Sequence, residues 1–504
     1  MCSQLKFCKT VIFQMFEGPK KTWGLFLVIL VMTVVGHAEP ANNFAIFNQI
    51  NATTKLSIAF ASQNNHQPES AFGHVFLVLH QQTPPEPNAQ VIEFVGHLES
   101  FQDMLATLHS KVDGRYRVLE FSEKSLDYDL ESRDLYLIEL KTEPRQLEQL
   151  VGIVRQQTDQ NFPYTFAKYN CAYYLAVILE KQDFLTRQVS SQIYVEPVDL
   201  IKVIDEKKVA HVSFIPSSHR VLSQYKSQLT PDQLLALERF ERGNDIAMET
   251  DNDLLSQTLS AYIRYQLPRE PEAWKRQHLA SSQKKIWHDV PEINATSLGE
   301  DTRGQYALSV YSGGAIGMRF QPELRNFFSM HAPNQAGAYL DLLSIDVIER
   351  VGHLDVSQFT VFRSESIHPE SNRSRLLDIS YRNWEVKTHR SDREAYLTWG
   401  IGPAFDVNGV SMAVIPNLTL AATQSDANAT NIRLGYRALA EWHSAAIGLR
   451  IQTDRWTNSP FLFSHEDTVQ VRFKLDRKTN IGWEIGRVPQ LNQNFQRLLV
   501  THAI

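Results

Sequence analysis

Several features that would assign a function at once are missing from this sequence. Its formal net charge of −6 over 504 residues gives no argument for binding nucleic acid. No glycine-rich phosphate loop occurs, and no spacing of histidine with acidic residues is typical of a metal site. We therefore expect no cofactor, no metal and no nucleic-acid partner. The chain is also too long for one ordinary domain, so two or three domains are expected.

Long hydrophobic runs are equally scarce. The apolar run over residues 23–35 is too short to be a confident membrane span. Two lysines precede it and small residues ending at Ala38 follow it, a pattern typical of a secretory signal peptide over residues 1–38. No other apolar run approaches spanning length. We therefore expect an exported chain without a transmembrane helix.

Cysteine is the third scarcity, with residues at positions 2, 8 and 171. The first two would leave with the signal peptide, so Cys171 would be the single cysteine of the mature chain, which excludes a disulfide within it. An unpaired thiol in an oxidising compartment is a liability unless it is used. This favours a functional Cys171. The alternative is an inert, buried, small hydrophobic residue.

Before residue 220 the sequence mixes strand and helix patterns. Continuous apolar runs predict strands that are covered on both faces of a sheet. Thr142, followed closely by a proline, predicts the start of a helix with one apolar face. The order of elements predicts a compact α+β domain over residues 45–220. Its predicted strands are 55–61, 71–79, 91–97 and, after a polar region, 133–140.

Residues 171–180 predict a helix that is apolar nearly all round, and such a helix is buried in a domain core. A short polar approach ends at Asn170, which puts Cys171 in the first helical turn. There the unpaired N–H groups and the positive end of the helix dipole favour the thiolate over the thiol. This arrangement is typical of a cysteine nucleophile.

A cysteine nucleophile needs a neighbouring base, and we predict that His74 is that base. His74 begins a buried strand, and Gly73 lets the backbone approach closely. Glu93, on the next strand, is predicted to accept a hydrogen bond from the imidazole; the alternative is a solvent-facing glutamate. The competing histidines of the region are expected to be surface or satisfied residues. They are His80, His97 and His109.

Four short motifs occur in this region in a fixed order. They are Ser70-Ala-Phe-Gly-His74, Glu131-Ser-Arg-Asp-Leu135, Phe162-Pro-Tyr-Thr-Phe166 with Asn170-Cys171, and Val195-Glu-Pro-Val-Asp-Leu200. In these motifs most of residues 55–220 resemble the Lnb N-terminal periplasmic domain family. The Asn-Cys pair that heads a helix, with a histidine upstream, is also similar to lecithin retinol acyltransferase and other circularly permuted papain-like enzymes.

The resemblance implies a permuted papain-like fold in which Cys171 is the nucleophile and His74 the base. It also implies acyl transfer on bacterial lipoproteins, in which a fatty acyl chain moves between a glyceryl oxygen and an N-terminal amine. Glu93 departs from the family pattern, because relatives tend to have asparagine on the strand after the histidine. Asn170, Tyr169 and Ser70, which lie in or beside the motifs, are expected to contact the substrate.

The remainder of the chain changes periodicity. Residues 221–300 are predicted to be a helical spacer, because leucines recur at helical spacing. From residue 301 to 504 apolar and polar residues alternate in about a dozen strands, as in 467–476. This pattern predicts an antiparallel outer-membrane β-barrel, apolar outside and polar within. A soluble β-sandwich is the alternative. The C-terminus, Thr-His-Ala-Ile504, lacks the aromatic residue that such barrels usually carry.

The leading interpretation is an exported, cysteine-dependent acyltransferase or hydrolase that acts on a lipid or lipoprotein. It would sit in the bacterial outer membrane with its N-terminal domain in the periplasm. Two alternatives stay open. One is a cysteine amidase or peptidase that acts on cell-wall peptides, and the other is a non-catalytic outer-membrane channel or assembly protein.

Overall fold

The computed structural model describes residues 53–62, 73–97, 103, 106–107, 111–166, 168–192, 195–243, 254–270, 272–285, 305–311, 316–321, 323–325, 337–350, 353–368, 372–386, 390–423, 430–444, 447–459, 462–475, 479–488 and 493–502. The predicted signal peptide, Ser70 and His109 lie outside these residues. Within them, no helix is long and apolar enough to cross a membrane. The chain divides into two compact units, one built mainly on residues 74–217 and the other on 218–267 and 273–504.

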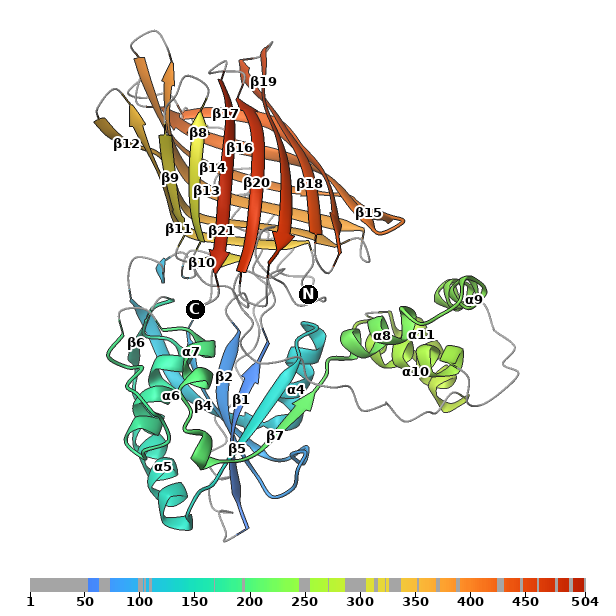
Figure 1. Cartoon of the computed structure of the whole chain (residues 1–504). Coiled ribbons are helices and arrows are strands. Elements are labelled where there is room, and N and C mark those ends of the chain that lie inside the picture. Colours follow the sequence, from blue (N-terminus) through green and yellow to red (C-terminus); the bar gives the residue numbers. More distant parts are fainter. Residues whose placement is uncertain are drawn as a thin grey trace, which may run out of the picture. The chain divides into compact units, whose positions relative to one another are not determined.

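The first unit is built on one antiparallel sheet of seven strands in the order β6-β4-β3-β2-β1-β5-β7 (Figure 1). Its mixture of helices and strands confirms the mixed fold expected for the N-terminal region. The strands are β1 (Lys55–Ala61), β2 (His74–His80), β3 (Gln90–Gly96), β4 (Val112–Glu120), β5 (Leu135–Leu140), β6 (Phe162–Tyr164) and β7 (Val209–Ile215). The helices are α4 (Phe121–Leu130), α5 (Pro144–Gln157), α6 (Cys171–Glu180), α7 (Pro197–Lys202) and a 3₁₀ turn, η3 (Glu206–Lys208).

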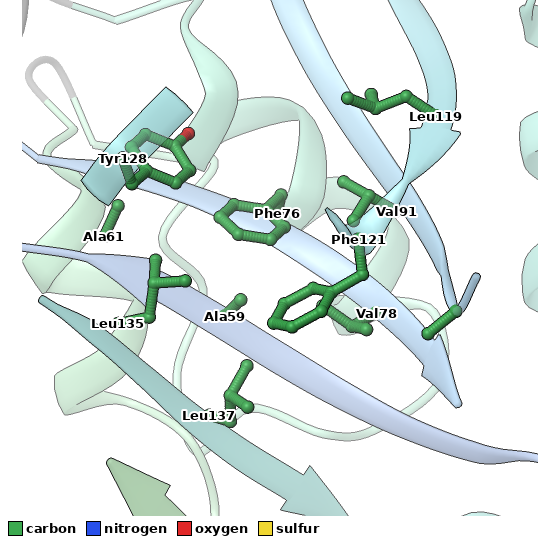
Figure 2. Packing of buried hydrophobic residues seen from close by; sticks show 11 residues of the cluster. Ala59, Ala61, Phe76, Val78, Val91, Leu119, Phe121, Tyr128, Leu135 and Leu137 are labelled. Atoms are coloured by element: carbon green, nitrogen blue, oxygen red, sulfur yellow. The ribbon is translucent and has the colours of Figure 1, made fainter. Parts of the chain in front are cut away.

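One face of this sheet packs against α4. Successive residues of a strand point to opposite faces, so alternate residues of β1, β2 and β5 form a continuous apolar layer. Tyr128 and Phe121 of α4 complete this layer, as Figure 2 shows. The cluster consists of Ala59, Ala61, Phe76, Val78, Ala89, Val91, Leu119, Phe121, Tyr128, Leu135 and Leu137.

The opposite face packs against α6. Phe94 and Tyr116 face each other across β3 and β4, and Tyr174 of α6 stacks on Phe94 with ring centroids 3.8 Å apart. The Tyr116 hydroxyl donates to the backbone oxygen of Tyr174 at 3.3 Å. Glu93 precedes Phe94 on β3, so it points to the α4 face instead. The two helices that bear on the candidate site therefore lie on opposite faces of one sheet.

The second unit begins with four helices, α8 (Ser218–Lys226), α9 (Pro231–Glu241), α10 (Leu254–Gln266) and α11 (Ala273–Lys285). They share small apolar cores of their own. The larger core contains Leu229, Leu237, Phe240, Leu259, Ile263 and Leu279. The sequence predicts helices across this region, and the structure has them; whether they act as a spacer stays a prediction.

The rest of the second unit is a closed antiparallel barrel (Figure 1). Its strands are β8 (Gln305–Tyr311), β9 (Ile316–Gln321), β10 (Glu323–Arg325), β11 (Ala338–Arg350), β12 (His353–His368), β13 (Arg373–Val386), β14 (Arg390–Gly402), β15 (Ala404–Val407), β16 (Val410–Thr423), β17 (Thr430–His443), β18 (Ile447–Ser459), β19 (Leu462–Lys474), β20 (Thr479–Val488) and β21 (Gln493–His502).

Closure follows from the pairing of β21 with β8, β8 with β9, and β9 with β11. β10 continues β9 along β11 in the same register, and β15 likewise continues β14 along β16. The described strands therefore occupy twelve positions in the wall, and a closed wall excludes the two-sheet sandwich. An antiparallel all-β C-terminal region is confirmed.

The barrel wall is apolar outside and polar inside. On β17, Leu434, Tyr436 and Trp442 are exposed, whereas Arg437 and Glu441 between them are buried. On β18 the apolar residues at 447, 449 and 451 are exposed and the charged residues at 450 and 454 are buried. This is the alternation expected of a barrel whose outer surface contacts lipid.

At the barrel end where β8 begins, inward side chains from distant strands meet. Glu365 of β12 forms ion pairs with Arg437 of β17 and Arg450 of β18. The Tyr339 hydroxyl on β11 donates a hydrogen bond to the Glu441 carboxylate on β17. β12 and β18 are five positions apart in the twelve-position wall. These contacts therefore cross the lumen rather than join neighbouring strands.

Candidate active site

The candidate site lies where β2 begins and α6 begins. Gly73 immediately precedes His74 and has a φ of 79°, a left-handed conformation that favours glycine. This turn sets His74 as the first residue of β2. Cys171 is the first residue of α6, and its side chain is buried. The structure brings these two side chains together from positions 97 residues apart.

Asn170 fixes the start of α6. Its side-chain oxygen accepts hydrogen bonds from the backbone N–H groups of Ala172 and Tyr173, at 3.0 and 3.2 Å. Its side-chain nitrogen donates to the backbone oxygens of Phe166 and Val195, at 3.1 and 2.7 Å. Asn170 is thus an N-cap that also ties the helix start to the segment before α7. These contacts give it a positioning role, and its predicted contact with substrate stays a prediction.

The Cys171 thiol is hydrogen-bonded to the His74 imidazole and to the backbone N–H groups of Val75 and Ala172. Burial alone would raise the pKa of Cys171, but the charge of His74 and these hydrogen bonds lower it below its ordinary value. The helix N-terminus acts in the same direction. Both influences act toward a thiolate beside an imidazolium.

His74 has a second partner on its other side. Its Nε2 lies 3.2 Å from Oε2 of Glu93. Burial would lower the pKa of His74, but the Cys171 thiolate and the Glu93 carboxylate raise it above its ordinary value, with Lys124 opposing them. Cys171, His74 and Glu93 thus form a continuous chain of polar contacts, in the order that nucleophile, base and orienting group require.

Glu93 is fully buried and surrounded by cations. Lys124 of α4 places Nζ 2.8 Å from Oε2, and Arg117 of β4 places Nε 3.8 Å from Oε1. Burial would raise the pKa of Glu93, but Lys124, His74 and Arg117 together hold it well below its usual range. Glu93 therefore stays ionised. Sequence reasoning missed Lys124 and Arg117; the one signal available was that Lys124 and Tyr128 are four residues apart and share a helix face.

Tyr164 of β6 is near enough to Cys171 for the two groups to interact electrostatically. Burial raises its pKa, and the negative charge of Cys171 raises it further, so the phenol keeps its proton. Two glycines make room for this side chain. A Cβ added at Gly96 would lie 2.7 Å from the Tyr164 ring, and one added at Gly114 would lie 3.0 Å from the Tyr164 Cβ. The absence of side chains at these two positions therefore leaves room for the Tyr164 ring and, at Gly114, for the Phe94 ring as well.

The other predicted site residues lie apart from this chain of contacts or outside the described residues. Tyr169 is partly exposed, with Nζ of Lys111 5.0 Å and Nζ of Lys168 5.6 Å from its ring centroid. His80 bonds to Ser57 at 2.7 Å and to the backbone oxygen of residue 82 at 2.6 Å. Ser70 and His109 lie outside the described residues. In the part of the chain that the structure describes, no group of three or more His, Cys, Asp or Glu side chains could hold a metal ion.

Replacing Asn170 with alanine is expected to loosen the first turn of α6. The loss of a buried N-cap is expected to lower the free energy of opening this turn by about 2 kcal/mol. The open state would then be roughly 30-fold more populated, and amide exchange correspondingly faster. Hydrogen exchange of the amides of Ala172 and Tyr173, followed by mass spectrometry on the full chain, measures this. Asn161→Ala is the control, because its amide makes one 3.4 Å contact at the surface. Equal exchange in Asn170→Ala and the parent chain would contradict the capping role.

Residues 43–207 match the family model for the Lnb N-terminal periplasmic domain. A comparison with curated proteins finds no match. Matching solved structures include the KdgM porin, at 12% identity and a TM-score of 0.25 over 40% of this chain and 98% of that chain. An outer membrane channel from Pseudomonas putida F1 matches at 8% identity and a TM-score of 0.28, over 43% and 100%. Similarity this low carries no argument, so the barrel is inferred from its own strand pairing.

The described features agree on a location. The matched family is a periplasmic one by its description, and the closed barrel that follows has an apolar outer face. Together they fit an outer-membrane protein whose N-terminal domain lies in the periplasm, which is the predicted location.

Proposed function

From the premise that residues 43–207 are an Lnb N-terminal periplasmic domain, we propose that this chain is a cysteine-dependent acyltransferase or hydrolase acting on a lipid or lipoprotein. The observation that carries the proposal is the buried Cys171–His74 pair. The Cys171 sulfur is hydrogen-bonded to the His74 imidazole and accepts hydrogen bonds from two backbone N–H groups. A barrel in the same chain supports a lipid substrate, because it would tether the domain at a membrane.

The proposed reaction begins with the Cys171 thiolate, which attacks the carbonyl carbon of an ester. The negative charge that develops on the carbonyl oxygen is stabilised by the N–H group of Cys171 at the start of α6, since the next two N–H groups donate to Asn170. The His74 imidazolium then gives its proton to the departing alcohol as the carbon–oxygen bond breaks. A thioester of Cys171 and a free alcohol result.

The second half of the reaction regenerates the thiol. An amine, or water in a hydrolase, attacks the thioester carbonyl while the now neutral His74 takes a proton from it. The carbon–sulfur bond breaks, and the thiolate and imidazolium return to their starting state. Glu93 holds the imidazole through both steps. A nucleophile at the start of a helix packed on an antiparallel sheet supports the permuted papain-like arrangement, which we propose for this domain.

The thioester is the species that tests this proposal. Incubating the full chain in detergent micelles with a diacyl lipopeptide or a phospholipid is expected to add one fatty-acyl mass to Cys171. A site that passes the acyl group to an amine should discourage water, so the adduct should accumulate when no amine is supplied. Mass spectrometry of the peptide that contains Cys171 measures it. Neutral hydroxylamine should remove the mass, because it cleaves thioesters readily.

Cys171→Ser is the matched variant, since it keeps the size of the side chain but cannot form a thioester. A hydroxylamine-sensitive adduct on Cys171→Ser would show that acylation occurs elsewhere. Cleavage of a cell-wall peptide amide, with no acyl adduct under any lipid condition, would replace the acyltransferase with the amidase alternative.

A further inference from the structure

We propose that Lys124 is a positioning residue for the dyad: it holds the Glu93 carboxylate in place and keeps its charge compensated while His74 loses and regains a proton. The inference rests on the proposed function for its catalytic meaning, but the contacts that carry it do not depend on the identity of the substrate. Lys124 lies on α4, on the face of the sheet opposite α6.

The geometry places Lys124 and His74 on the same carboxylate oxygen. Oε2 of Glu93 lies 2.8 Å from Nζ of Lys124 and 3.2 Å from Nε2 of His74. The Lys124 side chain is 14% exposed and the Glu93 side chain 0%. Nζ of Lys124 also lies 4.9 Å from the centre of the Tyr128 ring. The carboxylate on one side and the aromatic ring on the other therefore fix the position of the Lys124 amine.

The reaction explains why a second, permanent cation is needed. A buried carboxylate is costly unless a positive charge accompanies it. His74 supplies that charge only while it is protonated, and it is neutral between giving its proton to the departing alcohol and taking one from the incoming amine or water. Arg117 lies farther off, with Nε 3.8 Å from Oε1. Lys124 therefore keeps Glu93 ionised and in place during the step in which His74 is neutral.

Lys124 also opposes the effect of Glu93 on the pKa of His74. The charged groups that face the dyad are Glu93 and Arg117 from β3 and β4, Lys124 and Asp127 from α4, and Arg133, which lies over the Tyr128 ring. Among these, the Lys124 charge lowers the pKa of His74, against Glu93 and Cys171. Without Lys124 the imidazolium would hold its proton more tightly, so His74 would give that proton to a leaving group less readily.

The test is Lys124→Met against Lys124→Arg in the full chain. In Lys124→Met the imidazole signal of His74 should titrate at higher pH by NMR, by roughly one pH unit. Iodoacetamide alkylation of Cys171 should not extend to lower pH, because His74 is already protonated on the acid side of that profile. Lys124→Arg keeps the charge and should retain the parent titration. Lys141→Met is the charge-matched control, because Lys141 is an exposed lysine whose amine bonds to the backbone oxygen of Lys207 at 3.0 Å.

An unchanged titration of His74 in a folded Lys124→Met variant, or the same shift in Lys124→Arg, overturns the proposal. If Lys124→Met does not fold, the double variant Lys124→Met with Glu93→Gln removes both buried charges. In it His74 should titrate at lower pH than in the parent chain, since the imidazole has lost the carboxylate, and an unmoved titration again overturns the proposal. The titration of His74 needs no acyl substrate, so these outcomes are separate from the thioester test of the proposed function.

Discussion

Alkylation of Cys171 at pH 7 is expected to slow by about a hundredfold when His74 is replaced with alanine, because a buried thiol without a cation is about 1% ionised at that pH. In the parent chain the His74 charge and hydrogen bond lower the pKa of Cys171 against its burial. Removing the imidazole leaves burial as the main influence, and burial raises a thiol pKa. The thiolate population, and with it the alkylation rate, should collapse.

The dependence on pH has a definite sign. A thiol whose pKa is lowered is reactive above that pKa, so the parent rate should reach its plateau at a lower pH than that of an ordinary thiol. In His74→Ala the rate should instead keep rising into alkaline solution. Iodoacetamide labelling of the peptide that contains Cys171, at a series of pH values, measures both profiles. His211→Ala, at an exposed position of β7, should behave as the parent. A flat, fast profile in His74→Ala would show that His74 does not activate the thiol.

The second large effect is expected in the barrel. Glu365→Ala should destabilise it by about 3–5 kcal/mol, because removing one member of a buried ion cluster leaves the others charged and unpaired. Glu365 is the shared partner of Arg437 and Arg450, and all three side chains are buried. Samples heated to a series of temperatures and then run on a gel measure this loss. The temperature at which the fast-migrating folded band disappears should be lower for Glu365→Ala than for the parent chain.

The control for this prediction is Glu349→Ala, which removes a carboxylate from an exposed position on β11. Its effect should be within about 0.5 kcal/mol of zero, as is usual for exposed charges. Matching unfolding temperatures for Glu365→Ala and the parent barrel would mean that the ion cluster contributes nothing to the closed wall.

Much of the fold was accessible from periodicity. Alternation at period two predicted the barrel strands, since one face of each strand meets lipid and the other a polar lumen. The apolar helix after Asn170 predicted the buried position of Cys171 at its first turn. β4 and α4 were missed for a physical reason. β4 has Arg115 and Arg117 facing away from its apolar side, and α4 buries only Phe121 and Tyr128, so neither segment shows a strong apolar repeat.

Because β4 and α4 were not predicted, the part of the candidate site that they supply was not predicted either. Cys171, His74 and Glu93 follow from short motifs and from the order of strands. The cations around Glu93 do not, because Lys124 and Arg117 lie on the two missed elements. Their contacts depend on how β3, β4 and α4 pack, and a strand or helix pattern does not specify such packing. The pairs inside the barrel are hidden for the same reason, since Glu365 and Arg450 are 85 residues apart.

The ion cluster at the β8 end of the barrel also has an electrical consequence. Glu365, Arg437 and Arg450 are 2%, 8% and 5% exposed, so little water reaches the point where they meet across the lumen. Each arginine faces two carboxylates, Arg437 those of Glu365 and Asp454 and Arg450 those of Glu365 and Glu441. Because these charges screen one another, we expect this part of the inner wall to attract neither cations nor anions strongly.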